Sequence, residues 1–193
     1  MKHKLIETGI QLFDQNGFKS TSVQDIVQLL GVTKGTFYYY FNSKEELLKD
    51  IHLIYIEELV QQQEKIIKNR QTSFTKKLYE IVTLLIRNIR TERQSARIFT
   101  REMRHLSGHY LEEIKDKRNQ FRKNMQRLIE AGMQQGEFKS GLPSDILTMG
   151  ILGITNWSYY WYNPDGEVSE EKIVDIFVQM ILNGISINDS VYN

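Results

Sequence analysis

The stretch GVTKGTFYYYFNSKEEL, residues 31–47, decides the interpretation of this chain because it holds five consecutive aromatic residues, 37–41. A helix over residues 34–40 advances about 100° per residue. Three of the five rings then share one side through their i, i+3, i+4 spacing, whereas Tyr38 and Tyr39 point away from them. The pattern predicts an inward aromatic face and an outward tyrosine pair.

Capping residues on both sides of this helix predict a helix-turn-helix. Helices are expected over residues 5–13 and 22–30, ended by Asn16-Gly17 and by Gly31. Thr33 is a suitable N-cap for the helix over 34–40. A short turn that contains glycine and joins two short helices is typical of a helix-turn-helix.

Ser43 and Glu46 have the spacing of a capping box, in which each side chain bonds the backbone N–H of the other residue. A long helix to about Lys68 is expected to follow. Five more helices are expected over residues 72–90, 94–106, 108–135, 143–162 and 169–187. With only two prolines in 193 residues, the predicted fold class is all-α.

The outward side of the helix over 34–40 has chemistry that suits DNA. Lys34 adds positive charge at a helix N-terminus, where backbone N–H groups favour phosphate. Gly35 permits close approach of a large partner. Tyrosine hydroxyls donate to phosphate oxygens, and their rings contact thymine methyls. The alternative is that these aromatics form only core and ordinary surface.

Composition limits the other function classes. The formal net charge is +1, and the first fifty residues hold six lysines and six acids, so any attraction to DNA must be local. The absence of cysteine excludes disulfides and fits a cytoplasmic protein. The N-terminus has no secretory signal pattern, and the most apolar stretch, 146–161, is too short and interrupted for a membrane span.

At TSVQDIVQLLGVTKGTFYYYFNSKEELL, residues 21–48, and GIQLFDQNGF, residues 9–18, the chain resembles the DNA-binding domain of TetR-type transcriptional regulators. The resemblance departs at Gly9, where the family usually has alanine. It implies a helix-turn-helix domain over 1–47 and a larger helical ligand-binding and dimerisation domain over 48–193. Including the adjacent positions, the expected DNA contacts are Thr21, Ser22, Thr33, Lys34, Gly35, Thr36, Tyr38, Tyr39, Tyr40 and Lys44.

Tyr40 is divided between two roles, because its spacing places it on the buried side while the resemblance implies a phosphate contact. The resemblance also implies a homodimer that reads a near-palindromic operator and is built through its last two helices. The expected dimer residues are Ile151, Ile154, Tyr159, Tyr162, Phe177, Met180, Ile181 and Gly184.

The resemblance implies an effector pocket inside the helices from about 72 to 162. The expected lining is Leu85, Ile89, Phe99, Met103, Phe121, Met125, Leu128, Trp157, Tyr160 and Trp161, each of which has ordinary core as its alternative role. Together they favour a small apolar effector.

NWSYYWYNPDGEVSEEKIVDIFVQMILNGI, residues 156–185, is similar to the branch that represses fatty-acid or steroid degradation. That similarity favours a long-chain acyl-CoA as the effector. Its phosphates could then be bound by arginines among Arg90, Arg97, Arg101 and Arg104. The alternative is that these arginines only form a solvated helix face. A multidrug-responsive repressor of an efflux gene, with a drug stacked on the tryptophans, is the rival.

Other signals are set aside. His105 and His109 have i, i+4 spacing that suits zinc, but Ser107-Gly108 is expected to break the helix between them. No catalytic arrangement of serine, histidine and acid stands out, so no enzyme activity and no cofactor are expected. A helical protein-interaction module that uses the same aromatics is the remaining alternative.

Overall fold

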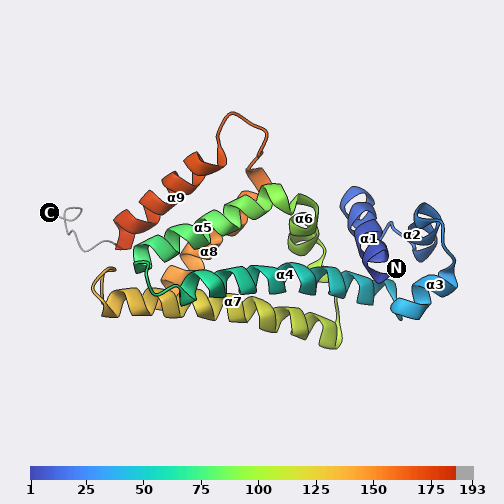
Figure 1. The fold of residues 1–193 in the computed structure, drawn as a ribbon, viewed down its shortest axis with the longest axis horizontal. Helices are drawn as coiled ribbons and strands as arrows, with labels where there is room; N and C mark the ends of the chain where they lie inside the picture. Colours follow the sequence, from blue (N-terminus) through green and yellow to red (C-terminus); the bar gives the residue numbers. More distant parts are fainter. Residues whose placement is uncertain (186–193) are drawn as a thin grey trace. The chain divides into compact units, whose positions relative to one another are not determined.

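The computed structural model describes residues 1–185, and this part of the chain is all-α (Figure 1). The helices are α1 (Lys2–Asn16), α2 (Val23–Leu30), α3 (Lys34–Tyr40), α4 (Lys44–Lys68), α5 (Phe74–Thr91), α6 (Arg93–Arg101), the 3₁₀ helix η1 (Met103–His105), α7 (Gly108–Gln134), α8 (Ser144–Trp161) and α9 (Glu170–Ile185). The all-α prediction is confirmed. The last two residues of the helix predicted over 169–187 lie outside the described residues.

The expected helix over 94–106 is wrong in one respect, because it is two elements rather than one. α6 ends at Arg101, and Glu102 follows with φ −100° and ψ −3°. The N–H of His105 then donates to the Glu102 carbonyl at 2.9 Å, so the chain tightens into the i→i+3 pattern of η1.

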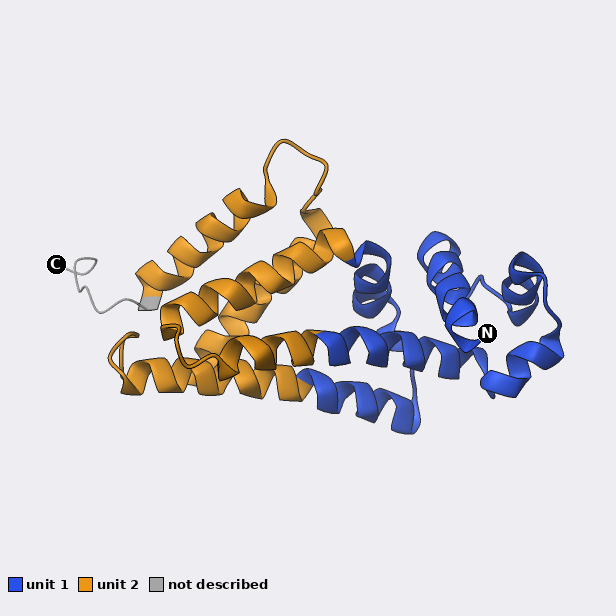
Figure 2. Cartoon of the chain, in the orientation of Figure 1, with its two compact units in different colours: residues 1–58, 92–118 blue, residues 59–91, 119–193 orange. Residues whose placement is uncertain are grey.

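The chain forms two compact units (Figure 2). Unit 1 comprises Met1–Glu58 and Glu92–Arg118, and unit 2 comprises Leu59–Thr91 and, among the described residues, 119–185. The helix-turn-helix therefore shares its unit with α6, η1 and the first part of α7. Both α4 and α7 begin in unit 1 and end in unit 2.

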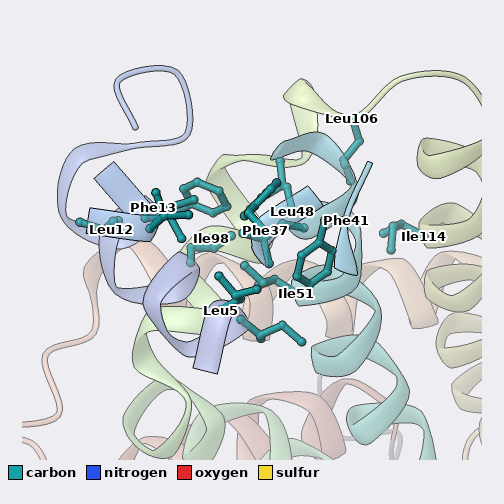
Figure 3. Close-up of a cluster of buried hydrophobic side chains, with 14 residues drawn as sticks. Leu5, Leu12, Phe13, Phe37, Phe41, Leu48, Ile51, Ile98, Leu106 and Ile114 are labelled. Atoms are coloured by element: carbon teal, nitrogen blue, oxygen red, sulfur yellow. The ribbon is translucent and has the colours of Figure 1, made fainter. Parts of the chain in front are cut away.

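The core of unit 1 joins the first four helices to the later segment (Figure 3). Phe37 and Phe41 are 0% and 1% exposed, which confirms the predicted inward face of α3. Ile98 of α6 and Ile114 of α7 belong to the same cluster of buried side chains. Burying this apolar area is the main source of the unit's stability.

In unit 2, α5 packs on α8 and α9. Both carboxylate oxygens of Glu137 accept from the first N–H groups of α5, at 3.0 Å from Phe74 and 2.9 Å from Thr75. These bonds satisfy donors that a helix start leaves without a partner. Tyr79 of α5 donates to Asp175 of α9 at 3.1 Å.

No helix among the described residues is long and apolar enough to cross a membrane.

Candidate nucleic-acid interface

The turn between α2 and α3 is built by caps. The Ser22 hydroxyl accepts from the Asp25 N–H at 3.1 Å, and an Asp25 carboxylate oxygen accepts from the Ser22 N–H at 2.7 Å. Gly31 ends α2 in the left-handed conformation, with φ 70° and ψ 33°, as the sequence predicts. The Thr33 hydroxyl accepts from the Thr36 N–H at 3.2 Å and starts α3. These local bonds hold α3 across α2 as a helix-turn-helix.

α3 divides its rings as predicted from their spacing. Tyr38 and Tyr39 are 54% and 81% exposed. Tyr40 is half-buried against the core of unit 1, and its ring meets that of Tyr39 edge to face at 4.8 Å. The exposed face therefore carries two tyrosines, with Tyr40 at its border. The phosphate contact of Tyr40 stays a prediction.

The N-terminal turn of α3 is open to a partner. Thr33, Lys34 and Gly35 are exposed, and Thr36 is half-buried. The Thr33 and Thr36 hydroxyls lie 3.1 Å apart. A Cβ built on Gly35 would meet only the Thr33 hydroxyl oxygen, at 3.5 Å, so the protein itself leaves room for a methyl group there.

Two side chains expected at DNA donate to carbonyls of the protein itself, and the burial of one of them, Thr21, corrects its assignment as a DNA contact. Lys44 Nζ donates to the carbonyls of Phe18 and Thr21 at 2.6 and 2.5 Å, and it lies 4.2 Å from the centre of the Phe18 ring. Burial lowers the pKa of Lys44. The Thr21 side chain is buried and donates to the Gly17 carbonyl at 2.9 Å. Both side chains fix the loop before α2. Thr21 does so from a buried position, whereas Lys44 is half-buried and its DNA contact stays a prediction.

The capping box predicted at the start of α4 is half correct. The Glu46 N–H donates to the Ser43 hydroxyl at 3.1 Å. The Glu46 carboxylate, however, accepts from the N–H of Asn42 at 2.6 Å and from its side-chain amide at 2.9 Å. Asn42 offers two donors to one carboxylate oxygen, which the spacing of Ser43 and Glu46 does not reveal.

Residues far along the chain also hold the helix-turn-helix, and sequence reasoning missed this support. Arg97 of α6 forms a paired salt bridge with Asp14 of α1, with Nε 2.6 Å from Oδ1. Glu45 of α4 accepts from the N–H and the hydroxyl of Ser107, at 2.7 and 2.9 Å. The His105 ring stacks on Phe18 with centroids 5.4 Å apart. These partners are more than sixty residues apart in sequence, so no local sequence pattern predicts their contacts.

In unit 2, the expected rotation of α8 about its axis is wrong. Trp157, Tyr160 and Trp161, predicted inside the bundle, are 64%, 55% and 51% exposed. Ile151 and Tyr162, predicted at a dimer surface, are buried within the protomer at 4% and 8% exposed. The buried face of α8 comprises Thr148, Ile151, Leu152, Thr155 and Ser158.

Hydroxyl groups that bond within α8 make this rotation possible. Thr148 and Thr155 donate to the carbonyls four residues earlier, at 2.7 and 2.9 Å, and Ser158 does so at 3.2 Å. A side chain that satisfies its hydroxyl on its own helix can be buried at little cost.

On α9, Phe177 and Ile181 are also buried, which corrects their placement at a free surface, while Met180 is 57% exposed. Gly184 is exposed, and Ile154 and Tyr159 of α8 are half-buried. Of the predicted dimer residues, Met180 and Gly184 are thus the exposed ones.

The remaining predicted effector contacts fall into two groups. Leu85, Ile89, Phe121, Met125 and Leu128 are buried in unit 2. Phe99 and Met103 are half-buried in unit 1, against its core. Two arginines expected at an effector have protein partners, because Arg97 pairs with Asp14 and Arg90 donates to the Pro164 carbonyl.

Within residues 1–185, no three His, Asp or Glu side chains are grouped as a metal site would require. His105 instead lies 3.3 Å from Glu102, and the His109 ring lies 4.1 Å from that of Tyr110.

A capped turn and a second helix with an open, tyrosine-bearing face define a helix-turn-helix DNA-binding protein. Comparison with known families makes this specific. Residues 5–51 match the model for bacterial regulatory proteins of the tetR family, and residues 71–185 match the tetracyclin repressor-like C-terminal domain. The chain belongs to the tetR family, and it is a DNA-binding transcriptional regulator, not an enzyme.

Individual relatives agree along most of the chain. It is 26% identical over 188 residues to the HTH-type transcriptional repressor KstR2 of Rhodococcus jostii (strain RHA1), covering 95% of this chain and 90% of the relative. The crystal structure of PfmR, a TetR family transcriptional regulator from Thermus thermophilus, is 26% identical, with a TM-score of 0.85 over 93% of this chain and 97% of that chain.

A third comparison concerns AibR in complex with isovaleryl coenzyme A and operator DNA. It has a TM-score of 0.83 and 23% identity and covers 93% of this chain and 96% of that chain. At this identity the likeness shows the fold alone.

Proposed function

We propose that this regulator is a repressor that binds a near-palindromic operator as a homodimer and is released by a small apolar effector. The observation that carries the DNA-binding part is the exposed face of α3, where Tyr38 and Tyr39 follow an open first turn with Lys34 and Gly35. Phe37 and Phe41 anchor the opposite face in the core. A helix held this way can enter a major groove without losing its own packing.

We place the DNA-contacting domain at residues 1–47 and the effector and dimerisation functions at 48–193, in a cytoplasmic protein. Residues 92–118 belong to the same compact unit as residues 1–58. In this proposal they brace the DNA-reading helices, because Arg97 is bonded to α1 and Ser107 to α4.

The proposed dimer surface is the outward stripe of α8 with the neighbouring edge of α9. On α8 the stripe recurs at helical spacing and comprises Ile146, Met149, Gly150, Gly153, Trp157, Tyr160 and Trp161. On α9 it includes Ile176 and Met180, which are 41% and 57% exposed. A continuous apolar stripe of this kind suits an interface between proteins. A two-fold dimer then presents two copies of α3 to two half-sites about 34 Å apart.

An acyl-CoA is our favoured effector class. AibR, which shares this fold, forms a complex with both isovaleryl coenzyme A and operator DNA, so the fold can serve such an effector. In this chain, Arg101 and Arg104 are exposed and offer guanidinium groups to phosphate. The rival is a drug-responsive repressor, in which a drug would stack on the tryptophans. Trp157 and Trp161 are exposed and lie on the proposed dimer surface, so they give this rival less support.

The proposed release follows from linkage. The effector binds better to a conformation whose two α3 helices do not match successive major grooves. α4, which begins beside α3 and continues into unit 2, would transmit the change. A differential affinity of about 3 kcal/mol shifts the equilibrium more than a hundredfold.

Selection from random DNA duplexes tests the DNA-binding part without knowledge of the operator. The purified chain should enrich an inverted repeat, with binding that weakens as salt increases. Tyr39→Ala should reduce affinity for the enriched duplex and leave the oligomeric state unchanged, while Tyr39→Phe isolates the hydroxyl. Failure to enrich any sequence would count against a sequence-specific regulator.

Titration of the protein–operator complex with acyl-CoAs of increasing chain length tests the effector part. Operator affinity should fall for at least one range of chain lengths. Unchanged affinity across the whole series, together with release by a cationic aromatic drug, would replace our favoured effector with the rival.

A further inference from the structure

The polar side chains that α3 can offer to a base are few and of a narrow kind. Residues 33–41, from its N-cap to its C-cap, read TKGTFYYYF. They hold one lysine and no arginine, asparagine, glutamine, aspartate or glutamate. The side chains that form specific hydrogen bonds with base edges in the major groove are mostly drawn from these six types. Lys34 is therefore the one charged side chain that this helix can place against a base.

The hydroxyl groups of the same segment do not select a base by their hydrogen bonds. The Thr33 and Thr36 hydroxyls lie 3.1 Å apart and bond each other, and the Thr33 hydroxyl also accepts from the Thr36 N–H at 3.2 Å. The Tyr38 and Tyr39 hydroxyls both donate and accept, so they can meet a phosphate or the edge of any base. Discrimination between bases by hydrogen bonds from α3 thus falls to Lys34.

The Lys34 side chain is free to reach a partner. It is exposed, and within residues 1–185 its ammonium group has no hydrogen-bond or ion-pair partner. It is the first residue of α3, and the N-terminal residues of a recognition helix are those that contact base edges. Lys34 and Tyr38 are four positions apart, so they share one side of the helix. Lys34 therefore lies on the face proposed to enter the major groove.

The chemistry of an ammonium group favours one base. It carries three donors and no acceptor. In the major groove guanine presents two neighbouring acceptors, N7 and O6. Adenine places the N6 donor beside its N7, cytosine presents a donor, and thymine presents a single acceptor beside a methyl group. A group that only donates is thus best satisfied at guanine.

We propose that Lys34 reads a guanine in each operator half-site by donating to its N7 and O6, and that Lys34 is the residue of α3 that determines base specificity. The inference rests on the proposed placement of α3 in the major groove, and it names the base that the helix selects there. It gives Lys34 a base contact, whereas a phosphate contact would add affinity without sequence information.

Duplexes with single changes in the sequence enriched by the wild type test the base contact. The wild type should prefer G·C at one position in each half-site over the other three base pairs by about tenfold. Replacing that guanine with 7-deazaguanine, which lacks the N7 acceptor, should weaken binding. Replacing it with inosine, which lacks only the amino group of the minor groove, should leave binding unchanged.

Variants of the full chain then assign the preference to its side chain. Lys34→Ala should bind the four duplexes with nearly equal affinity and lose its sensitivity to 7-deazaguanine. Lys34→Arg should keep the preference for guanine, and Lys34→Gln should prefer adenine, whose N6 and N7 pair with an amide. Lys19→Ala removes the same charge from an exposed position of the same unit, so it is the matched control and should keep the wild-type preference.

A phosphate contact of Lys34 gives a different result. Lys34→Ala would then bind all four duplexes more weakly by the same factor, keep the guanine preference, and lower the slope of log affinity against log salt by about one. That result would overturn the inference, and so would a Lys34→Gln protein that still prefers guanine, or a wild type without a guanine preference on its enriched sequence. Failure to enrich any sequence would refute the proposed sequence-specific function as well, so the two failures are distinguishable.

Discussion

Replacing Gly35 with alanine separates the demands of the fold from those of DNA at one position. Gly35 is the second residue of α3, is exposed, and does not have a positive φ. A new Cβ would meet only the Thr33 hydroxyl oxygen, at the ordinary contact distance of 3.5 Å. The substitution therefore introduces no clash. Alanine is also the better helix former, by roughly 0.5–1 kcal/mol. We expect the free energy of unfolding to rise slightly.

DNA binding should respond in the opposite direction. Gly35 lies one turn before Tyr38 and Tyr39, on the face proposed to enter the major groove. If bases or phosphates pack against this turn, a methyl group must displace them. Inserting a methyl into a well-packed contact costs about 1–3 kcal/mol. Each 1.4 kcal/mol is a factor of about ten in affinity, so the loss should lie between roughly fivefold and a hundredfold.

The assay is fluorescence anisotropy on the selected operator at one fixed salt concentration, with chemical denaturation of the same preparations. Gln11→Ala, on the exposed side of α1, is the matched control, because it also adds helix propensity at the surface. It should leave operator affinity unchanged. A Gly35→Ala protein that is stable and binds operator as tightly as the wild type would refute our placement of this turn against DNA.

Three further predictions concern packing, assembly and pH. Gly132→Ala should destabilise the protein by about 1–3 kcal/mol in chemical denaturation, because its Cβ would lie 2.3 Å from the buried Phe138 ring. In a Phe138→Ala background, where that ring is absent, the same substitution should become neutral or stabilising. Trp157→Glu should yield monomers in analytical ultracentrifugation and weaken operator binding, whereas Gln134→Glu, which adds the same charge at the end of α7, should not; a dimeric Trp157→Glu protein would exclude the α8 stripe as the interface. Between pH 6.5 and 4, His52 binds a proton in the unfolded chain but stays neutral in the folded chain, because its pKa is about 4 when folded. The free energy of unfolding should therefore fall by about 3 kcal/mol more in the wild type than in His52→Asn over this range. Equal pH profiles of the two proteins would contradict a buried neutral imidazole.

The helix-turn-helix could be predicted from the sequence because its signals are local. Ser22, Gly31 and Thr33 are cap residues whose bonds reach no more than five positions along the chain. The division of the α3 rings follows from helix periodicity, and Phe37 and Tyr39 show its two extremes at 0% and 81% exposed. Such features depend little on the rest of the fold.

The support of this domain could not be predicted, because it depends on contacts between distant segments. Lys44 has the chemistry of a DNA contact, since it follows a recognition helix and carries a positive charge. Whether its ammonium group is free depends on where the carbonyls of Phe18 and Thr21 lie, 26 and 23 positions earlier. Arg97 suits an effector phosphate in the same way, although Asp14, 83 positions away, holds it.

Helix α8 differs from its prediction in another way, since its position along the chain was predicted correctly and its rotation about its axis was predicted wrongly. Apolar residues surround this helix, so hydrophobicity alone does not define an inward side. The ordinary assumption puts tryptophan inside and threonine outside, and α8 does the reverse, with Thr155 at 0% and Trp157 at 64% exposed. Small hydroxyl residues satisfied by their own helix allow α8 to pack within unit 2 while its largest rings face away.

This inverted arrangement is itself an argument about assembly. A helix that contributed only to the protomer core would gain by burying Trp157 and Tyr160, because large rings bury the most apolar area. The buried face of α8 instead combines Ile151 and Leu152 with three small hydroxyl residues, which contribute little hydrophobic free energy: Thr148, Thr155 and Ser158. The hydrophobic free energy that the exposed rings do not contribute within the protomer is gained if a second copy covers them. On the same stripe, a Cβ built on Gly150 or Gly153 has no neighbour within 4 Å, which leaves space for a partner helix. On this reasoning, dimerisation contributes to the stability of unit 2 itself, so the melting temperature of the wild type should rise with protein concentration, whereas that of Trp157→Glu should not.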